Sequence, residues 1–400
     1  MHIVYTNEDA PEVVTKSIFL AGPSPRKSTD PNWRAEAFEL LEAAGYDGVV
    51  YAPIWRDGPP DDSDKPFDYD GQVAWETKYL NQADVIVFWV PRNMKTLPAF
   101  TTNVEFGMWY QSGKVVLGFP DDAPKMTFLY KKGEEEGIES FGTLDATLNA
   151  AIRKLGEGAA RTGGEREVPL HLWNKQEFQT WYASQTAVGN VLNGASVSWT
   201  FRVGKKKERV FLWALHVNVH IAAENRDKTN EVVVFRPDIS TIVAYCPPTG
   251  IDGPLSFADT EVVLVSEFRS PANNPIAMVV EVPGGSSLKA GVAPETTASE
   301  EMHEETGLAI EASRFRPIGA RQIAATLAAH RAHCYAVRLT PDEMLALKWE
   351  AGKPHGNHDD TEYTFVEITT VTALMKKNTA DWSNLGMIFQ ALYTLETGEL

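Results

Sequence analysis

The N-terminal part of the chain alternates short apolar runs with amphipathic segments. The apolar runs have the length of strands, and the segments between them repeat apolar residues at helical spacing. Such alternation is typical of a parallel sheet covered by helices on both faces. We therefore predict a doubly wound parallel sheet with strands at 17–21, 48–53, 84–90 and 114–118, and helices at 32–44, 71–81, 103–112 and 143–155.

A segment rich in glycine and charge, residues 156–168, interrupts this alternation. It has almost no large apolar side chain, which predicts an exposed boundary. A helix is expected near 175–185. The sequence thus predicts a first domain at 1–155, a linker with a connecting helix at 156–190, and a second domain at 191–400.

The second domain has a different pattern, with β-rich runs separated by turn-forming segments. This predicts a mixed or antiparallel sheet. The expected strands are 210–222, 231–235, 241–245, 261–268, 277–282, 333–339 and 363–368, and the expected helices are 294–306 and 383–395.

Composition narrows the classes of function. The chain has 54 Asp and Glu against 37 Lys and Arg, a net charge of −17, which argues against binding to nucleic acid or anionic membranes. The two cysteines, Cys246 and Cys334, form no CxxC pair, so neither a disulfide framework nor a zinc site is indicated. The start has no basic segment followed by an apolar one, and the longest apolar runs are strand-sized. We expect a cytoplasmic protein.

Four acids crowd the expected helix 294–306. Glu301, Glu304 and Glu305 stand at i, i+3 and i+4 and share one helix face, and Glu300 lies beside them. Like charges at i, i+4 cost about 0.2–0.5 kcal/mol per pair, and a divalent cation would offset this cost. Magnesium and manganese prefer such oxygen ligands. The alternative is a solvated acidic helix face.

Residues 301–308, EMHEETGL, resemble the second half of the Nudix box, and Val282-Pro-Gly-Gly285 precedes them where the Nudix hydrolases have their glycines. The resemblance implies an α/β/α sandwich with a mixed sheet, and bound Mg²⁺ or Mn²⁺ that activates water and clamps a diphosphate. It implies Glu301, Glu304 and Glu305 as metal ligands, with Glu304 and Glu305 also catalytic. The Gly285 carbonyl and Glu362 are the further ligands that it implies, and Glu281 and Asp360 are alternatives to Glu362.

The first half of the box departs from the family pattern. Val292 stands where the family has a glutamate, Glu300 stands where it has an arginine, and the glycine loop is one residue longer. The strand 261–268 with Arg269 resembles the ADP-ribose pyrophosphatase branch, in which an arginine contacts the substrate. Arg269 is therefore a candidate for substrate binding, and an ordinary surface ion pair is the alternative.

Polar groups also follow the predicted strands of the first domain. The loop Gly22-Pro-Ser-Pro-Arg26 leaves the carboxyl end of a parallel strand, which is where open α/β sheets bind ligands. Asp84 begins the strand 84–90, and Glu105 lies near the start of the next helix. A glutamate at that position is favoured by the helix dipole in any case.

Together SIFLAGPSPR, NQADVIVFWVPR and FTTNVEFGMW resemble the nucleoside 2-deoxyribosyltransferase family and its relatives that hydrolyse N-glycosidic bonds, over residues 15 to 155. The resemblance implies a flavodoxin- or Rossmann-like sheet, no cofactor, a homo-oligomer, Glu105 as the nucleophile and Asp84 as the acid that protonates or holds the base. Ser24, Arg26 and Asn103 would contact the sugar or a 5′-phosphate, Gly22 would belong to the same substrate-binding loop, and Arg92 would contribute positive potential to substrate binding. The acidic loop 55–70 would either restrict the pocket or be solvated surface.

The two resemblances suggest a bifunctional enzyme with small nucleotide substrates. The first domain would break an N-glycosidic bond, and the second would hydrolyse a nucleoside diphosphate derivative such as ADP-ribose. Sequential breakdown of NAD is one such pathway, and deoxynucleotide salvage or sanitation is equally open. The alternative is a sensor, in which a Nudix domain without activity binds a nucleotide and regulates the first domain, as the losses at Val292 and Glu300 suggest.

Overall fold

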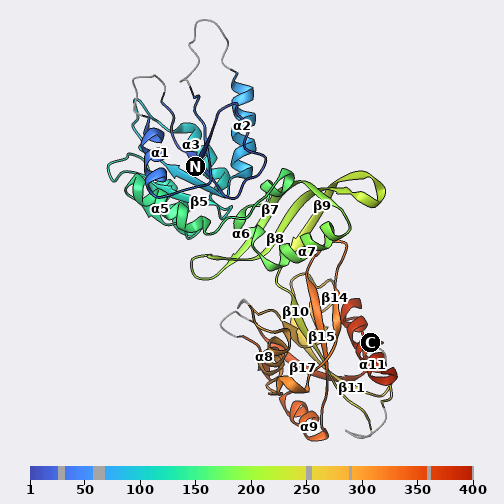
Figure 1. Ribbon diagram of the computed structural model, residues 1–400. Coiled ribbons are helices and arrows are strands. Elements are labelled where there is room, and N and C mark those ends of the chain that lie inside the picture. The colour runs from blue at the N-terminus through green and yellow to red at the C-terminus, as the bar shows by residue number, and fades with distance from the viewer. Residues whose placement is uncertain (26–31, 57–67, 249–254, 288–290, 358–361, 399–400) are drawn as a thin grey trace. The chain divides into compact units, whose positions relative to one another are not determined.

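The computed structural model describes residues 1–25, 32–56, 68–248, 255–287, 291–357 and 362–398. The chain forms two compact units, Met1–Phe235 and Arg236–Leu400, and Figure 1 labels many of their elements.

The first unit contains a six-stranded sheet in which every pair of neighbours is parallel. Its order is β1-β3-β2-β4-β5-β6, which confirms the predicted parallel sheet and adds an edge strand at each side. Without β1 the order is that of flavodoxin-like folds. The strands are β1 (His2–Tyr5), β2 (Ser17–Ala21), β3 (Val49–Ala52), β4 (Val85–Trp89), β5 (Val115–Gly118) and β6 (Ser140–Phe141).

Helices cover both faces of this sheet, because its strands are apolar on both sides. In β2, Ile18 and Leu20 pack with α1 (Trp33–Ala43) and α5 (Leu144–Leu155). Phe19 and Ala21, which point the other way, belong to the core of the opposite face. The helices of that face are α2 (Tyr69–Gln82), α3 (Phe100–Trp109) and α4 (Thr127–Glu135).

The strand order creates a switch point between β2 and β4. The chain passes from β2 to β3 on one side, and then crosses back to β4 on the other side of β2. At such a point the loops after the two strands diverge and leave a crevice at the carboxyl ends. The loop that begins with Gly22 and the segment that leads from β4 into α3 follow these two strands at that edge.

A three-stranded antiparallel sheet completes the first unit. It comprises β7 (Val191–Val203), β8 (Arg209–Ile221) and β9 (Arg226–Phe235), with η2 (Ala222–Glu224) between the last two. Trp213 stacks on Phe235 at 4.2 Å between ring centroids, and both lie against Phe178. Phe178 belongs to α7 (Gln176–Ala187), which follows η1 (Gly163–Glu167) and α6 (Leu170–Trp173).

The segment 156–168 is not an exposed linker throughout. Arg161 is 1% exposed and Val168 is fully buried, so that part of the prediction is wrong. The compact units divide after Phe235, whereas the sequence led us to place the second domain from 191 onward. The difference arises because β7–β9 pack on helices of the first unit.

The second unit contains a mixed sheet of order β14-β15-β10-β11-β17-β16, with β12 beside β11 and β13 beside β10. Strands β10 and β15 run parallel, and the other pairs are antiparallel. This confirms the predicted mixed sheet. The strands are β10 (Ile239–Cys246), β11 (Glu261–Phe268), β12 (Met278–Glu281), β13 (Gly284–Gly285), β14 (Arg316–Gln322), β15 (Arg331–Arg338), β16 (Pro354–His355) and β17 (Thr364–Thr370).

Helices cover both faces of this sheet as well. Helices α8 (Pro294–Thr306) and α9 (Pro341–Glu350) pack on one face, with η3 (Ala312–Arg314) next to α8. Helices α10 (Val371–Leu374) and α11 (Trp382–Thr397) pack on the other. In the described part of the chain no helix is both long and apolar enough to cross a membrane.

Candidate functional site

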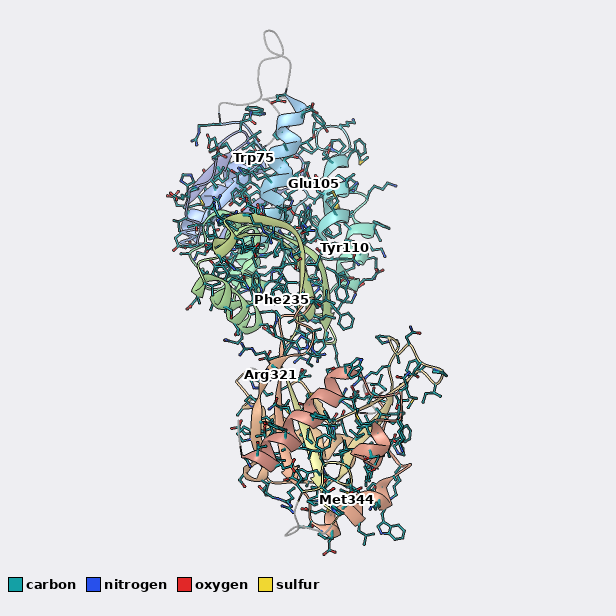
Figure 2. All side chains as sticks on the ribbon, turned by 90° about the vertical axis from the view of Figure 1, so that its right-hand side faces the viewer. Trp75, Glu105, Tyr110, Phe235, Arg321 and Met344 are labelled. Carbon is teal, nitrogen blue, oxygen red and sulfur yellow. The ribbon has the colours of Figure 1, made fainter. Side chains whose placement is uncertain are left out.

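Glu105 lies on α3, the helix that follows the switch-point strand β4. The residue before the helix, Ala99, has φ 59°, a left-handed conformation that is unfavourable for a side chain larger than glycine. Glu105 is half-buried, and no described residue donates a hydrogen bond to its carboxylate. Figure 2 labels Glu105 on α3 and Trp75 on α2, two helices of the same sheet face.

A second carboxylate, Glu76 of α2, interacts with Glu105. The pKa of Glu105 is raised to about 7, mainly by burial and secondly by the charge of Glu76. The positive charge of Arg34 acts in the opposite direction and lowers this pKa. Burial raises the pKa of Glu76 too, although Gln72 donates a hydrogen bond of 2.9 Å to its carboxylate. Glu76, Glu105 and Arg34 thus form one electrostatic cluster. No motif in the sequence points to Glu76 or Arg34.

Arg34 holds the loop after β2. Its side chain is fully buried and donates hydrogen bonds to the carbonyl oxygens of Leu20 and Gly22, at 3.1 and 2.9 Å, and to the Ser24 hydroxyl at 3.2 Å. Gly22 has φ 144°, and a Cβ there would lie 2.2 Å from the carbonyl oxygen of Trp89. Gly22 therefore allows the β2 loop to approach β4. Ser24 is exposed beside it, and Arg26 lies outside the described residues.

Asn103 and Arg92 contact each other. The Arg92 guanidinium is buried, with a pKa lowered by that burial, and donates hydrogen bonds to the Asn103 side-chain oxygen and, at 2.8 Å, to the carbonyl oxygen of Lys125. Arg92 therefore orients Asn103 near the start of α3. This contact positions Asn103, and a contribution of Arg92 to substrate binding stays a prediction.

Asp84 lies at the other end of the sheet. It precedes β4, and the five residues of that strand separate it by roughly 17 Å from the carboxyl edge. Its carboxylate accepts hydrogen bonds from Arg161 at 2.8 and 2.7 Å, and also from Ser17 and the Leu170 backbone. The structure does not bring Asp84 to Glu105. Asp84 forms a buried structural ion pair with Arg161. This position does not agree with the predicted role of Asp84 as the acid that protonates or holds the base.

In the second unit, Glu305 and Glu301 lie on the inner face of α8. Glu305 is 4% exposed, accepts a hydrogen bond of 2.8 Å from the Gly284 backbone, and has a pKa raised well above its usual range by burial. Burial, then the charges of Glu304 and Glu362, raise the pKa of Glu301 to about 7. The helix ends at Gly307, φ 75°, which places the acids in its last two turns.

The remaining acids of this region surround Arg269. Arg269 forms ion pairs with Glu267 at 2.8 Å and with Glu281 at 3.0 Å, so it has the ion-pair arrangement that was the alternative to substrate contact. Burial raises the pKa of Glu267 to about 7, and Glu362 and Glu281 contribute to the rise. The charge of Glu362 thus acts both on Glu301 of α8 and on Glu267 beside Arg269. Glu304 is exposed. Asp360 lies outside the described residues.

The donor chemistry of this cluster fits a hard divalent cation. The side chains of the cluster offer oxygen atoms, which such cations prefer. A Cβ on Gly285 would lie 2.5 Å from the Glu301 carboxylate, so only a glycine at this position leaves enough space for that carboxylate. As the side chains stand, no three His, Cys, Asp or Glu residues of the described ranges converge closely enough to hold an ion. Binding would therefore require rotation of Glu301 or Glu362.

Residues 15–123 match a family model described as nucleoside 2-deoxyribosyltransferase like. No curated protein matches the chain. The match includes Gly22, Arg34, Glu76 and Glu105, and it agrees with the resemblance found in the sequence except that it ends at 123 rather than 155. Nothing in it concerns the second unit. The first unit thus contains, at residues 15–123, a nucleoside 2-deoxyribosyltransferase-like domain.

Proposed function

We propose that the first unit cleaves or exchanges the N-glycosidic bond of a nucleoside, a nucleotide or an NAD-like substrate, with Glu105 as the nucleophile. The observation that carries the proposal is the cluster of Glu105, Glu76 and Arg34 beside the loop after β2, inside the segment that matches the family. Two carboxylates with raised pKa values can share one proton, so that one is ionised while the other is protonated.

In the first step the Glu105 carboxylate attacks the anomeric carbon. The bond from this carbon to the base breaks, and its electron pair stays on the base nitrogen, which takes a proton from Glu76. A glycosyl ester on Glu105 results, as in retaining glycosidases.

In the second step water or another base attacks the same carbon, and its proton passes to Glu76. The ester bond breaks with its electron pair returning to Glu105, which restores both carboxyl groups. Arg34 favours the ionised form of Glu105 by charge, and its hydrogen bonds fix the Gly22 loop.

A base-release screen tests this proposal. The intact protein is incubated with ribonucleosides, deoxynucleosides, deoxynucleotides and NAD, and free base is measured by chromatography, with and without a second base to distinguish transfer from hydrolysis. We expect release from at least one substrate, a loss of more than about a thousandfold in Glu105→Ala, and no change in Glu39→Gln, an exposed acid of α1. Release by Glu105→Ala at the normal rate would exclude Glu105 as the nucleophile.

We also propose that the second unit is a Nudix-type hydrolase of a nucleoside diphosphate derivative such as ADP-ribose. The supporting observation is the set of buried, mutually repelling acids on and beside α8. Glu301, Glu305, Glu362 and the Gly285 carbonyl would hold Mg²⁺ or Mn²⁺, with Glu304 at the outer side. The bound ion would supply Lewis acidity toward the diphosphate.

The competing proposal is a sensor that binds ADP-ribose without turnover. Manganese-dependent phosphate release from ADP-ribose and related diphosphates, measured with a coupled phosphatase, separates the two. A hydrolase predicts release that Glu305→Gln abolishes and that Glu311→Gln, an exposed acid near η3, leaves unchanged. Tight ADP-ribose binding without release would favour the sensor and contradict the hydrolase.

The expected homo-oligomer stays a proposal as well. Phe100, Val104 and Met108 stand at i, i+4 and i+8 on α3 and are 63%, 64% and 68% exposed, and a second copy would cover this apolar face. Light scattering of the intact protein and of Val104→Glu tests it, with Val188→Glu, exposed at the end of α7, as the control. A monomeric wild-type protein would contradict the proposal.

A further inference from the structure

A cavity of about 450 Å³ lies in the first unit, at the amino end of the six-stranded sheet and therefore at the opposite edge from the Glu105 cluster. Small-molecule sites typically have roughly 300–1,000 Å³. The walls come from the starts of β4 and β5, from α5 and α6, from the turn between α4 and β6, and from the β7–β8 hairpin. Neither Glu105 nor Glu76 lines it.

His171 of α6 contributes a polar atom that has no partner. His171 lines this cavity, and its Nε2 is a buried atom that has no hydrogen bond to any described residue. Burial and the charges of Lys154, Lys114 and Arg202 lower its pKa to about 3, so the imidazole is neutral and can carry its proton on Nε2. An unsatisfied buried donor costs about 1–3 kcal/mol, and a ligand acceptor would remove this cost.

Lys154, in the last turn of α5, lines the same cavity. Lys154 is exposed, and within the described ranges its ammonium forms neither an ion pair nor a hydrogen bond. A lysine at this end of a helix is favoured by the helix dipole, so its position alone indicates no ligand. The unpartnered His171 in the same cavity is the independent observation.

The acids that line the cavity do not neutralise Lys154, because each has another partner. These pairs are Asp84 with Arg161, Glu136 with Arg202 and Lys207, Glu139 with Lys206, and Glu208 with the Lys206 backbone. Lys114, whose charge also acts on His171, is not part of the cavity lining; it is buried and donates to the carbonyl oxygens of Leu80 and Asn81. Lys154 is thus a lysine of the cavity wall that no carboxylate of the described residues pairs with, in a chain of net charge −17.

We propose that this cavity binds a small phosphorylated metabolite, with its phosphate on Lys154 and His171 and its organic part against the apolar walls. Those walls include Val85, Val115, Ile138, Phe141 and Leu155. Ammonium and imidazole donors are the groups that bind phosphate through charge-assisted hydrogen bonds. The site is separate from both proposed activities and requires neither of them.

Binding to the full chain tests the proposal, with inorganic phosphate, ribose 5-phosphate, AMP and adenosine as the probes. Calorimetry gives the affinity, and hydrogen–deuterium exchange locates the binding. We expect slower exchange in residues 170–173 and 202–210, with adenosine binding at least tenfold more weakly than AMP. Lys154→Gln should raise the Kd of the phosphorylated probes at least tenfold. Arg153→Gln removes the same charge from the neighbouring residue, which is exposed like Lys154 but does not line the cavity, and should leave the Kd unchanged.

A second variant, His171→Gln, should weaken binding as Lys154→Gln does if the imidazole contacts the phosphate. The absence of protection in 170–173 and 202–210 at millimolar concentrations of all three phosphorylated probes would overturn the proposal. Equal affinities for adenosine and AMP would also overturn it, because the phosphate would then contribute nothing. So would equal effects of Lys154→Gln and Arg153→Gln, because general charge would then explain the result.

Discussion

Glu105 is a carboxyl group that its surroundings favour in the protonated form. Its pKa rises from 4.5 to about 7, first by burial and then by the charge of Glu76. The folded state therefore holds the proton of Glu105 more tightly than the unfolded state does. The contribution of this proton to the free energy of unfolding is complete below pH 4.5. That contribution falls as the pH rises through 7, by at most roughly 3 kcal/mol.

Glu105→Gln removes this pH dependence, since the amide has no proton to lose. We expect the variant to unfold like the wild type at pH 4 and at a higher temperature at pH 8, as measured by calorimetry. Glu76→Gln should lower the pKa of Glu105, because the second cause of the rise is removed. A stability difference between Glu105→Gln and the wild type that is equal at both pH values would contradict the raised pKa.

Asp84→Asn tests the structural position of Asp84. The Asp84 and Arg161 side chains are each 1% exposed, so loss of the carboxylate leaves a buried guanidinium without its counter-charge. We expect a loss of about 3–5 kcal/mol in stability, with base release per folded molecule retained. Asp47→Asn, which breaks the surface pair with Lys16, should cost under about 1 kcal/mol. A stable Asp84→Asn protein without base release would restore the catalytic role.

The sequence could identify Glu105 but not its partner. Glu105 belongs to a motif at the start of a helix, whereas Glu76 lies within α2 between the buried Trp75 and Tyr79. Only the fold, which places α2 and α3 on the same face of the sheet, shows that Glu76 acts on Glu105. The position of Asp84 was predictable. A residue that begins a parallel strand lies at the amino edge, while the Gly22 loop lies at the carboxyl edge, so the two could not share a site.

Elements with strong boundary residues were the most predictable. Helix α8 has the bounds expected for it, because Pro294 occupies its first position and Gly307 ends it in a left-handed conformation. Strand β7 was missed, because it is half-exposed, contains Gly194 and pairs with β8 through three irregularities of register. The mixed sheet follows from strand-sized runs, whereas the parallel pairing of β10 with β15 joins residues far apart in the chain and no local pattern reports it.

Gly285→Ala tests the proposed metal face of α8. The added Cβ would lie 2.5 Å from Oε1 of Glu301, at the movable end of a side chain, so the carboxylate should turn away at little cost in stability. We expect Mn²⁺ affinity, measured by electron paramagnetic resonance, to fall roughly 10–100-fold, as is typical when a ligand loses its orientation. Gly386→Ala in α11, which meets nothing within 4 Å, is the control. Unchanged Mn²⁺ affinity in Gly285→Ala would exclude Glu301 as an oriented ligand.

At the scale of the whole molecule, the division after Phe235 and the predicted boundary after 190 lead to different fragments. Strands β7–β9 supply Trp213 and Phe235, which are fully buried and lie against Phe178. The backbone of Ala195 also donates a hydrogen bond of 2.8 Å to Glu167. A fragment that ends at 190 loses these contacts, and losing even one large aromatic from a core typically costs about 3–5 kcal/mol.

We therefore expect fragment 1–235 to melt cooperatively and to release base at the rate of the intact chain. Fragment 1–190 should melt at a much lower temperature or not fold, because Phe178 and its neighbours on α7 would face water. Circular dichroism and tryptophan fluorescence follow both transitions, and fragment 236–400 shows whether the second unit folds without the first. If fragment 1–190 melts at the same temperature as fragment 1–235, the contacts of β7–β9 add nothing to the stability of the first unit. The boundary inferred from the glycine-rich segment then describes the folding unit better than the division after Phe235.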